Sequence, residues 1–187
     1  MLTIAQLRVP LKAVAILTAL ALLLSTAATV YAGIRKHNGF MSDNTAITCS
    51  SGTYYQTKYT TDHYLKAFAI ALVVGVLGCI GGFVVGMVMV CKMGAVSGKE
   101  EEGIDSVSEG KLRAVYVFGS VGMLGEMVVV GYCLSLFFDV RHSFCSNNYN
   151  PDWMIIGSLS LATLILLFVC MVFTLRLVNL WKDQEDP

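Results

Sequence analysis

Charged residues are scarce in this sequence. Only 14% of its 187 residues are Asp, Glu, Lys or Arg, whereas soluble domains carry about 25%. The 13 basic residues are balanced by 13 acidic ones, so no net positive charge is available to bind nucleic acid. Proline is rare as well, at three residues, and with the long apolar runs this excludes a disordered or collagen-like chain. Because 56% of the residues are hydrophobic, the class that remains is a membrane protein that crosses the bilayer several times.

The sequence also lacks the short motifs that mark common enzymes and metal sites. It contains no CxxC pair, no HExxH, no nucleophile elbow and no phosphate-binding loop. Its histidines, His37, His63 and His142, do not stand at metal-ligand spacing from a cysteine or a carboxylate. We therefore expect a protein that is not an enzyme and that holds neither a cofactor nor a metal ion.

Four long stretches with almost no charged residues follow one another along the chain. A helix needs about 20 apolar residues to cross the hydrocarbon layer of a membrane, which is ~30 Å thick. The four stretches contain 22, 25, 25 and 23 residues, and Glu126 is the only charged residue within them. Lipid offers no hydrogen-bond partner to the backbone, so these stretches are expected to be helices. The sequence therefore predicts an all-α integral membrane protein, a single four-helix transmembrane domain over residues 1–187, with spans at about 12–34, 66–92, 113–138 and 153–176.

The distribution of basic residues predicts the orientation in the membrane. With four spans both termini lie on one side, and the segments on that side hold eight Lys and Arg residues against five in the other two loops. Cytoplasmic segments are usually the richer ones, so we expect cytosolic termini and a cytosolic loop at about 93–112. The outer loops are then about 35–65 and 139–152. The first is rich in Tyr and Thr, which favours a small β-hairpin.

A cleaved signal peptide is the alternative interpretation of the first span. Arg8 and Lys12 precede the apolar run, and Val30-Tyr31-Ala32 is a tolerable cleavage site. The run is longer than the roughly 7–15 residues of a typical signal peptide, so we favour a retained span.

Three cysteines are candidates for covalent chemistry. Cys49 and Cys145 are the only cysteines in loops well away from a span, and both fall on the predicted outer side. Disulfides form and persist outside the cell and in the secretory lumen, so we predict a disulfide that joins the two outer loops. Cys91 stands beside Lys92 at the inner interface. This position fits palmitoylation, although an ordinary small buried residue is an equally good interpretation.

Glycines form a regular stripe on the second span. Gly78, Gly82 and Gly86 are four residues apart, and Gly75 widens the stripe. Small residues at this spacing form a groove in which another helix backbone can approach closely. Two interpretations are open, namely helix packing inside the bundle and a face on which a second protein docks.

Glu126 lies in the middle of the third span, where a charged side chain is costly. It is roughly 18 Å from either end at 1.5 Å per residue, too far for its carboxyl group to reach the interface. Ser25, Thr26, Cys79 and Thr163 lie at matching depth on the other spans. One interpretation is a neutral Glu126 that is hydrogen-bonded to such a hydroxyl and holds helices together. The other is an ion or proton site.

The predicted layout resembles that of four-pass claudin and MARVEL-type proteins, which have inner termini, a larger first outer loop and a smaller second one. The first outer loop here has no Trp and only Cys49, so the claudin pattern Trp…Gly-Leu-Trp…Cys…Cys is missing and the MARVEL-type group is the more similar. The Cys-Cys-Gly of tetraspanins is also missing. The resemblance implies a scaffold, junctional, trafficking or channel-auxiliary role.

Two functions from different classes are compatible with these features. The first is a non-enzymatic auxiliary subunit, organiser or trafficking partner of another membrane protein, in the plasma membrane or a secretory-pathway membrane. Its partners would be the lipid bilayer and another membrane protein or a second copy of itself. The alternative is a small oligomeric channel or transporter that uses Glu126.

Overall fold

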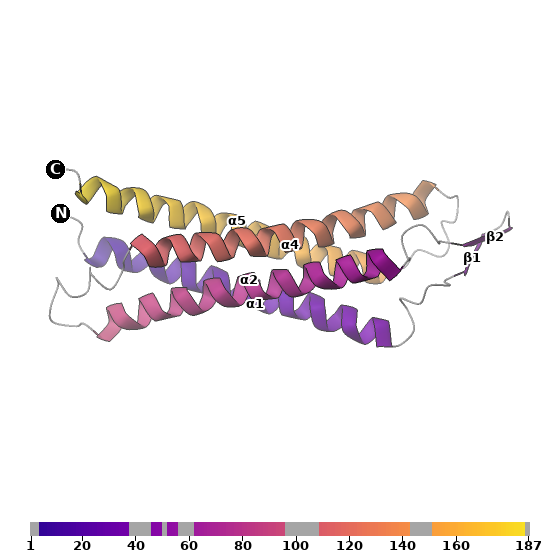
Figure 1. The fold of residues 1–187 in the computed structure, drawn as a ribbon, viewed down its shortest axis with the longest axis horizontal. Helices are drawn as coiled ribbons and strands as arrows, with labels where there is room; N and C mark the ends of the chain where they lie inside the picture. Colours follow the sequence, from indigo (N-terminus) through magenta and orange to yellow (C-terminus); the bar gives the residue numbers. More distant parts are fainter. Residues whose placement is uncertain are drawn as a thin grey trace.

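A computed structural model of the chain consists of four long α-helices and one pair of short strands (Figure 1). The structure describes the backbone of residues 4–37, 46–49, 52–55, 62–95, 109–142 and 151–185. It describes the side chains of residues 9–35, 66–92, 110–135 and 153–179. The four helices are α1 (Ile4–His37), α2 (Asp62–Ala95), α4 (Glu109–His142) and α5 (Pro151–Glu185).

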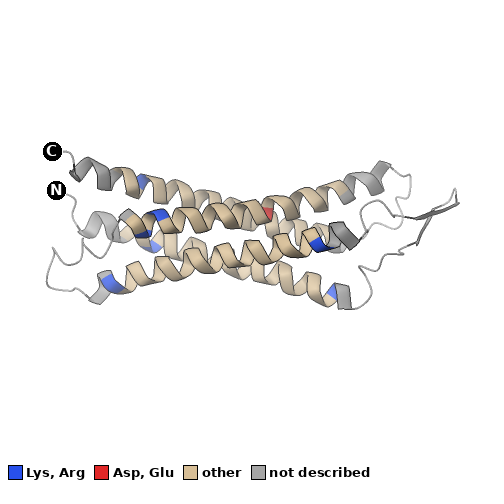
Figure 2. Cartoon of the chain, in the orientation of Figure 1, with Lys and Arg blue, Asp and Glu red and all other residues tan. Residues whose placement is uncertain are grey.

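All four helices are long and apolar enough to cross a membrane, as the sequence predicts. Their apolar stretches are Val9–Arg35, Lys66–Lys92, Gly110–Ser135 and Trp153–Asn179. A 26- or 27-residue stretch spans about 39 Å as a helix, which exceeds the hydrocarbon thickness and leaves the basic residues near the ends. Figure 2 shows this pattern, with Lys and Arg near both ends of the bundle and acidic colouring in its middle. Among the described side chains Glu126 is the only acidic one. These are the features of an integral membrane protein.

Each helix runs antiparallel to the one before it, so the start of α1 and the end of α5 lie at the same end of the bundle (Figure 1). The helices form a ring in which α1 packs against α2, α2 against α4, α4 against α5, and α5 against α1. The pair α1 and α4 and the pair α2 and α5 therefore face each other across the centre.

The strands β1 (Ala46–Cys49) and β2 (Gly52–Tyr55) pair antiparallel, with Ala46 opposite Tyr55 and Cys49 opposite Gly52. They lie beyond the end of the bundle where α1 finishes and α2 begins (Figure 1). Strand β2 includes Thr53, Tyr54 and Tyr55, the first residues of the segment rich in Tyr and Thr.

The interior of the bundle changes in character along its length. At the end that holds the chain termini it contains bulky aliphatic side chains, among them Leu11, Met89, Leu112 and Leu177. At the opposite end alanines fill much of the interface, and the rings of Phe68, Tyr132 and Trp153 pack against one another with centroids 5.0–5.7 Å apart.

Large apolar side chains also cover the outside of all four helices. Leu23, Ile70, Leu124 and Phe168 expose between 58% and 66% of their surface. In water such an exterior would be unstable, whereas in a bilayer lipid tails cover it. Several polar side chains are buried in the interior instead, namely Thr18, Ser25, Glu126, Ser160, Thr163 and Thr174.

Candidate functional site

Glu126 lies at the centre of the bundle, and none of its surface is exposed. The hydroxyl group of Ser25 donates a hydrogen bond to Glu126 Oε1 over 2.5 Å. Because Ser25 belongs to α1 and Glu126 to α4, this bond crosses the bundle between helices that face each other across its centre. Among the side chains that the structure describes, Glu126 is the only acidic one. Sequence reasoning placed the carboxyl group inside the bundle near Ser25, and the structure brings the two together.

Helix α2 packs against this site with a glycine, Gly75, which has no side chain. A Cβ atom added to Gly75 would lie 2.6 Å from Glu126 Oε1 and 3.4 Å from Ser25 Oγ. The hydrogen bond between Ser25 and Glu126 therefore fits only because residue 75 has no side chain. Cys79, one turn further along α2, is fully buried next to the same pair.

Helix α5 contributes Ser160, which the sequence analysis did not identify. Its side chain is fully buried and lies close enough to the Glu126 carboxyl group to interact with it. Neither Ser160 Oγ nor Glu126 Oε2 has a hydrogen-bond partner within ordinary distance limits. Ser160 stands three residues before Thr163, on the same face of α5, so a search by helix face in addition to depth would have found it.

The other two hydroxyl groups matched to Glu126 by depth lie elsewhere. Thr163 is fully buried, but its hydroxyl donates to the backbone carbonyl of Leu159 over 2.9 Å, so its one hydrogen-bond donor is used within α5. Thr26 is exposed on the outside of α1, and its assignment to the polar centre is wrong. Successive residues of a helix point about 100° apart, so Thr26 points outward where Ser25 points in.

The glycine stripe of α2 is buried inside the bundle along its whole length. Gly75 and Gly78 face α4, where Gly78 lies against the backbone of Gly122. Gly82 and Gly86 face α1, where added Cβ atoms would stand 3.5 Å from Thr18 Cγ2 and 3.6 Å from Ala15 Cα. The stripe therefore packs two neighbouring helices of the same chain, and these four glycines form no face for a second protein.

Glycines of α4 are divided between its two neighbours. Gly122 and Gly125 contact α2, since a Cβ at Gly125 would lie 2.6 Å from Ala71 O and from Gly75 N. Gly119 instead faces Met171 of α5, with 3.4 Å from an added Cβ to Met171 Cγ. A close contact between α2 and α4 thus runs through Gly122 and Gly125, directly before Glu126.

Gly131, in the second half of α4, lies on the outside of the bundle. It is exposed, and a Cβ atom added there would meet nothing within 4 Å. Ser135, one turn further on, is exposed too, and its hydroxyl donates back to the Gly131 carbonyl over 2.8 Å. Exposed Val128 and Leu134 border these residues with about half of their surface open. We call Gly131 and Ser135 with these borders the α4 notch.

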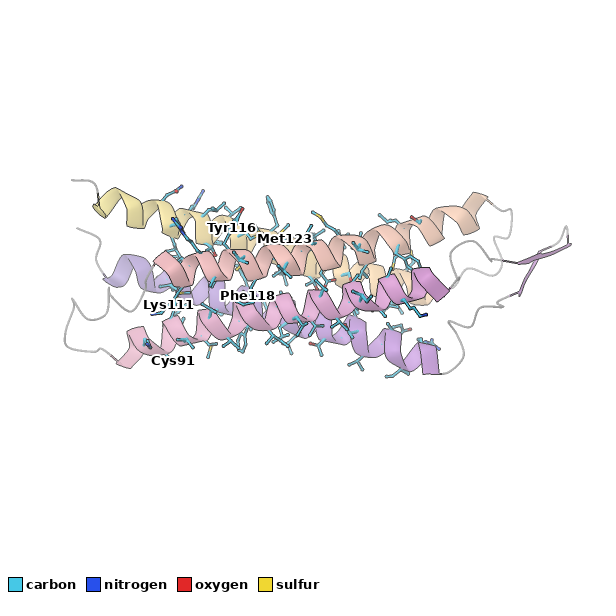
Figure 3. All side chains as sticks on the ribbon, viewed as in Figure 1. Cys91, Lys111, Tyr116, Phe118 and Met123 are labelled. Carbon is cyan, nitrogen blue, oxygen red and sulfur yellow. The ribbon has the colours of Figure 1, made fainter. Side chains whose placement is uncertain are left out.

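The cysteines differ in accessibility. Cys91 is exposed near the C-terminal end of α2 (Figure 3), so its thiol group is accessible from outside the bundle. Cys79, Cys133 and Cys170 are free thiols buried in the bundle. The predicted pairing of Cys49 with Cys145 lies outside the side chains that the structure describes.

Within the described residues no group of three or more His, Cys, Asp or Glu side chains is placed to hold a metal ion.

No family model, curated protein or solved structure matches this chain. The resemblance to claudin and MARVEL-type proteins therefore stays a prediction that rests on the layout of spans and loops.

Proposed function

We propose that this chain is a non-enzymatic four-pass membrane protein that acts as an auxiliary subunit, organiser or trafficking partner of another membrane protein. The α4 notch carries the proposal. A glycine buried between helices has a packing role, but Gly131 is uncovered on the outside, where its only neighbour would be lipid. In membranes small residues four apart let a second helix approach closely, and Gly131 with Ser135 has this spacing.

The notch is a site for a helix for a second reason. Lipid tails are as apolar as leucine, so helices in a membrane associate through close contact and hydrogen bonds and gain little from burying apolar surface. A notch bordered by Val128 and Leu134 offers that contact. The hydroxyl of Ser135 and the adjacent backbone add a polar group that a partner helix can reach.

The proposed orientation places both termini in the cytosol. Among the described side chains five basic residues lie at the end that holds the termini, namely Lys12, Lys92, Lys111, Arg113 and Arg176, and only Arg35 and Lys66 at the other (Figure 2). This asymmetry follows the rule for cytoplasmic ends. The strand pair then lies outside the cytosol, and the α4 notch faces the outer leaflet. The host membrane is the plasma membrane or a membrane of the secretory pathway.

The alternative, an oligomeric channel or transporter built around Glu126, has less support from the geometry. Such a pore needs Glu126 to face an axis shared by several copies. Its carboxyl group is instead buried within a single chain and bonded to Ser25.

A comparison of two uncovered glycines tests the proposal. Gly131→Leu fills the α4 notch, and Gly33→Leu is the matched control, because Gly33 of α1 is also exposed and without neighbours within 4 Å. Both variants should fold and reach the membrane like the wild type. We expect Gly131→Leu alone to lose a stoichiometric membrane partner that remains with the wild type and the control in mild detergent.

Photocrosslinking identifies the occupant of the notch. A photoreactive residue at position 128 should capture that partner in intact membranes, and one at position 23 of α1 should capture mainly lipid. Retention of the partner by Gly131→Leu, or crosslinks from position 128 to lipid alone, would contradict the proposal. Crosslinks from position 128 to a second copy of the chain would replace it with self-association.

A further inference from the structure

Two buried oxygen atoms at the centre of the bundle lack hydrogen bonds. They are Glu126 Oε2 on α4 and Ser160 Oγ on α5. Both side chains are fully buried, and the two groups are close enough to interact. The other carboxyl oxygen, Oε1, already accepts the hydrogen bond from Ser25. Buried polar atoms are nearly always bonded, so an unpartnered pair of neighbours needs an explanation.

We infer that this pair is a proton-binding site, in which Glu126 carries a proton on Oε2 at neutral pH and donates it in a hydrogen bond to Ser160 Oγ. The hydroxyl of Ser25 donates to Oε1, and the carboxyl group donates onward from Oε2. A short relay then runs from α1 through α4 to α5. It is independent of the α4 notch and adds a second site to the protein.

The charges around the carboxyl group favour the protonated form. A carboxylate in the membrane interior needs a positive partner or water. The nearest basic residue measured along the helices is Lys66, nine residues before Gly75 in α2, which amounts to about 13 Å along the axis. The groups that face Glu126 are Ser25 of α1, Cys79 of α2 and Ser160 of α5. Only the Cys79 thiol among them can titrate, and it offers no positive charge.

Packing favours a proton over a larger cation. A metal cation such as calcium takes six to eight oxygen ligands at 2.3–2.6 Å. The site offers one carboxyl group and two hydroxyl groups, and on α2 it is closed by the backbone of Gly75. A proton needs only one acceptor, and Ser160 Oγ is free to serve as that acceptor.

The consequence is a proton that exchanges only when the bundle opens. Ionisation of Glu126 would leave a charge without a partner between α1, α2 and α5, so it requires water to enter. Protonation is thereby linked to the contact between α4 and its neighbours. When the carboxyl group of Glu126 is neutral, its hydrogen bonds hold the helices together. Removal of the proton would loosen the packing of the bundle.

Infrared spectroscopy of the full chain in lipid bilayers tests the inference directly. A protonated carboxyl group has a carbonyl stretching band that is separate from the bands of carboxylates and amides. At neutral pH we expect this band in the wild type and its loss in Glu126→Gln. Ser25→Ala should move the band to higher frequency, because a hydrogen bond to the carbonyl oxygen is removed. Ser160→Ala should shift it as well, because the proton loses its acceptor.

Matched controls use hydroxyl groups on the outside of the same helices. Thr26 and Ser158 are exposed next to the two buried serines, so Thr26→Ala and Ser158→Ala should leave the band unchanged. If Glu126→Gln does not fold, the serine variants and their controls still test the inference, because they retain Glu126. The inference is overturned by a neutral-pH spectrum without the band, by a band that survives in folded Glu126→Gln, or by a band that Ser160→Ala does not move.

Discussion

Gly78 of α2 lies against the backbone of Gly122 in α4, with no side chain between the two helices. A Cβ atom at residue 78 would collide with the nitrogen and Cα of Gly122 and would stand 2.8 Å from the carbonyl oxygen of Phe118. In lipid, helix association depends on such close contact more than on burial of apolar surface. This contact therefore sets the distance between α2 and α4 beside the polar centre.

Alanine should destabilise the bundle at one position of the stripe and have little effect at another. Gly78→Ala forces its methyl group into a helix backbone that cannot move aside, and overpacking of this kind typically costs about 1–3 kcal/mol. Gly82→Ala places the same methyl group 3.5 Å from Thr18 Cγ2, an ordinary contact, and should change stability little. Unfolding of both variants in mixed micelles with increasing SDS gives the comparison. Equal stability of the two would show that α2 and α4 are further apart than the structure places them.

Replacement of Glu126 should separate hydrogen bonding from charge. Glu126→Gln keeps an oxygen that accepts from Ser25 and gains an amide that can donate to Ser160, so the free energy of unfolding should hardly change. Glu126→Leu removes the carboxyl group to which Ser25 donates and should destabilise the bundle by ~1 kcal/mol, the scale of interhelical hydrogen bonds in membranes. The measurement is the same SDS titration. A Glu126→Leu variant as stable as the wild type would show that the hydrogen bond to Ser25 contributes nothing.

Sequence reasoning located the helices because their physical cause is local. Each apolar stretch is long enough to cross the membrane by itself, and the nearest charges mark its ends. The inward direction of Glu126 followed from the same kind of argument, since a carboxyl group in lipid has no partner. Neither conclusion needed knowledge of which helices are neighbours.

Contacts between different helices could not be derived from the length and charge pattern of each apolar stretch. Depth along a span gives the height of a residue but not the direction in which it points, so Ser25 and Thr26 were equivalent in sequence and Ser160 was missed. The glycines show the same limit. Their spacing marks a packing face, but the crossing of the helices decides that Gly78 meets a backbone and Gly82 a threonine methyl group. The uncovered position of Gly131 also depends on this arrangement.

Cys91 should be the acylated cysteine if the chain carries a palmitoyl group. It is exposed near the C-terminal end of α2, beside Lys92 and close to the end of the apolar stretch, where an acyl chain can enter the membrane. Cys170 is buried in the bundle and is a suitable control. Thioester exchange after hydroxylamine treatment should label the wild type and Cys170→Ser but not Cys91→Ser. Undiminished labelling of Cys91→Ser would assign the modification to a different residue.

Cys49, at the end of β1, should form a disulfide with Cys145 in protein made through the secretory pathway. The bond would close a loop of about 95 residues and contribute up to ~4–5 kcal/mol by restricting the unfolded chain. The membrane already restricts that chain, so the measured gain should be smaller. Peptide mapping without reduction should recover the two cysteines in one linked fragment. Cys49→Ser, Cys145→Ser and the double variant should lose the same stability, since each removes one bond. Complete alkylation of both thiols in unreduced wild-type protein, or losses that add up in the double variant, would show that the two cysteines act separately.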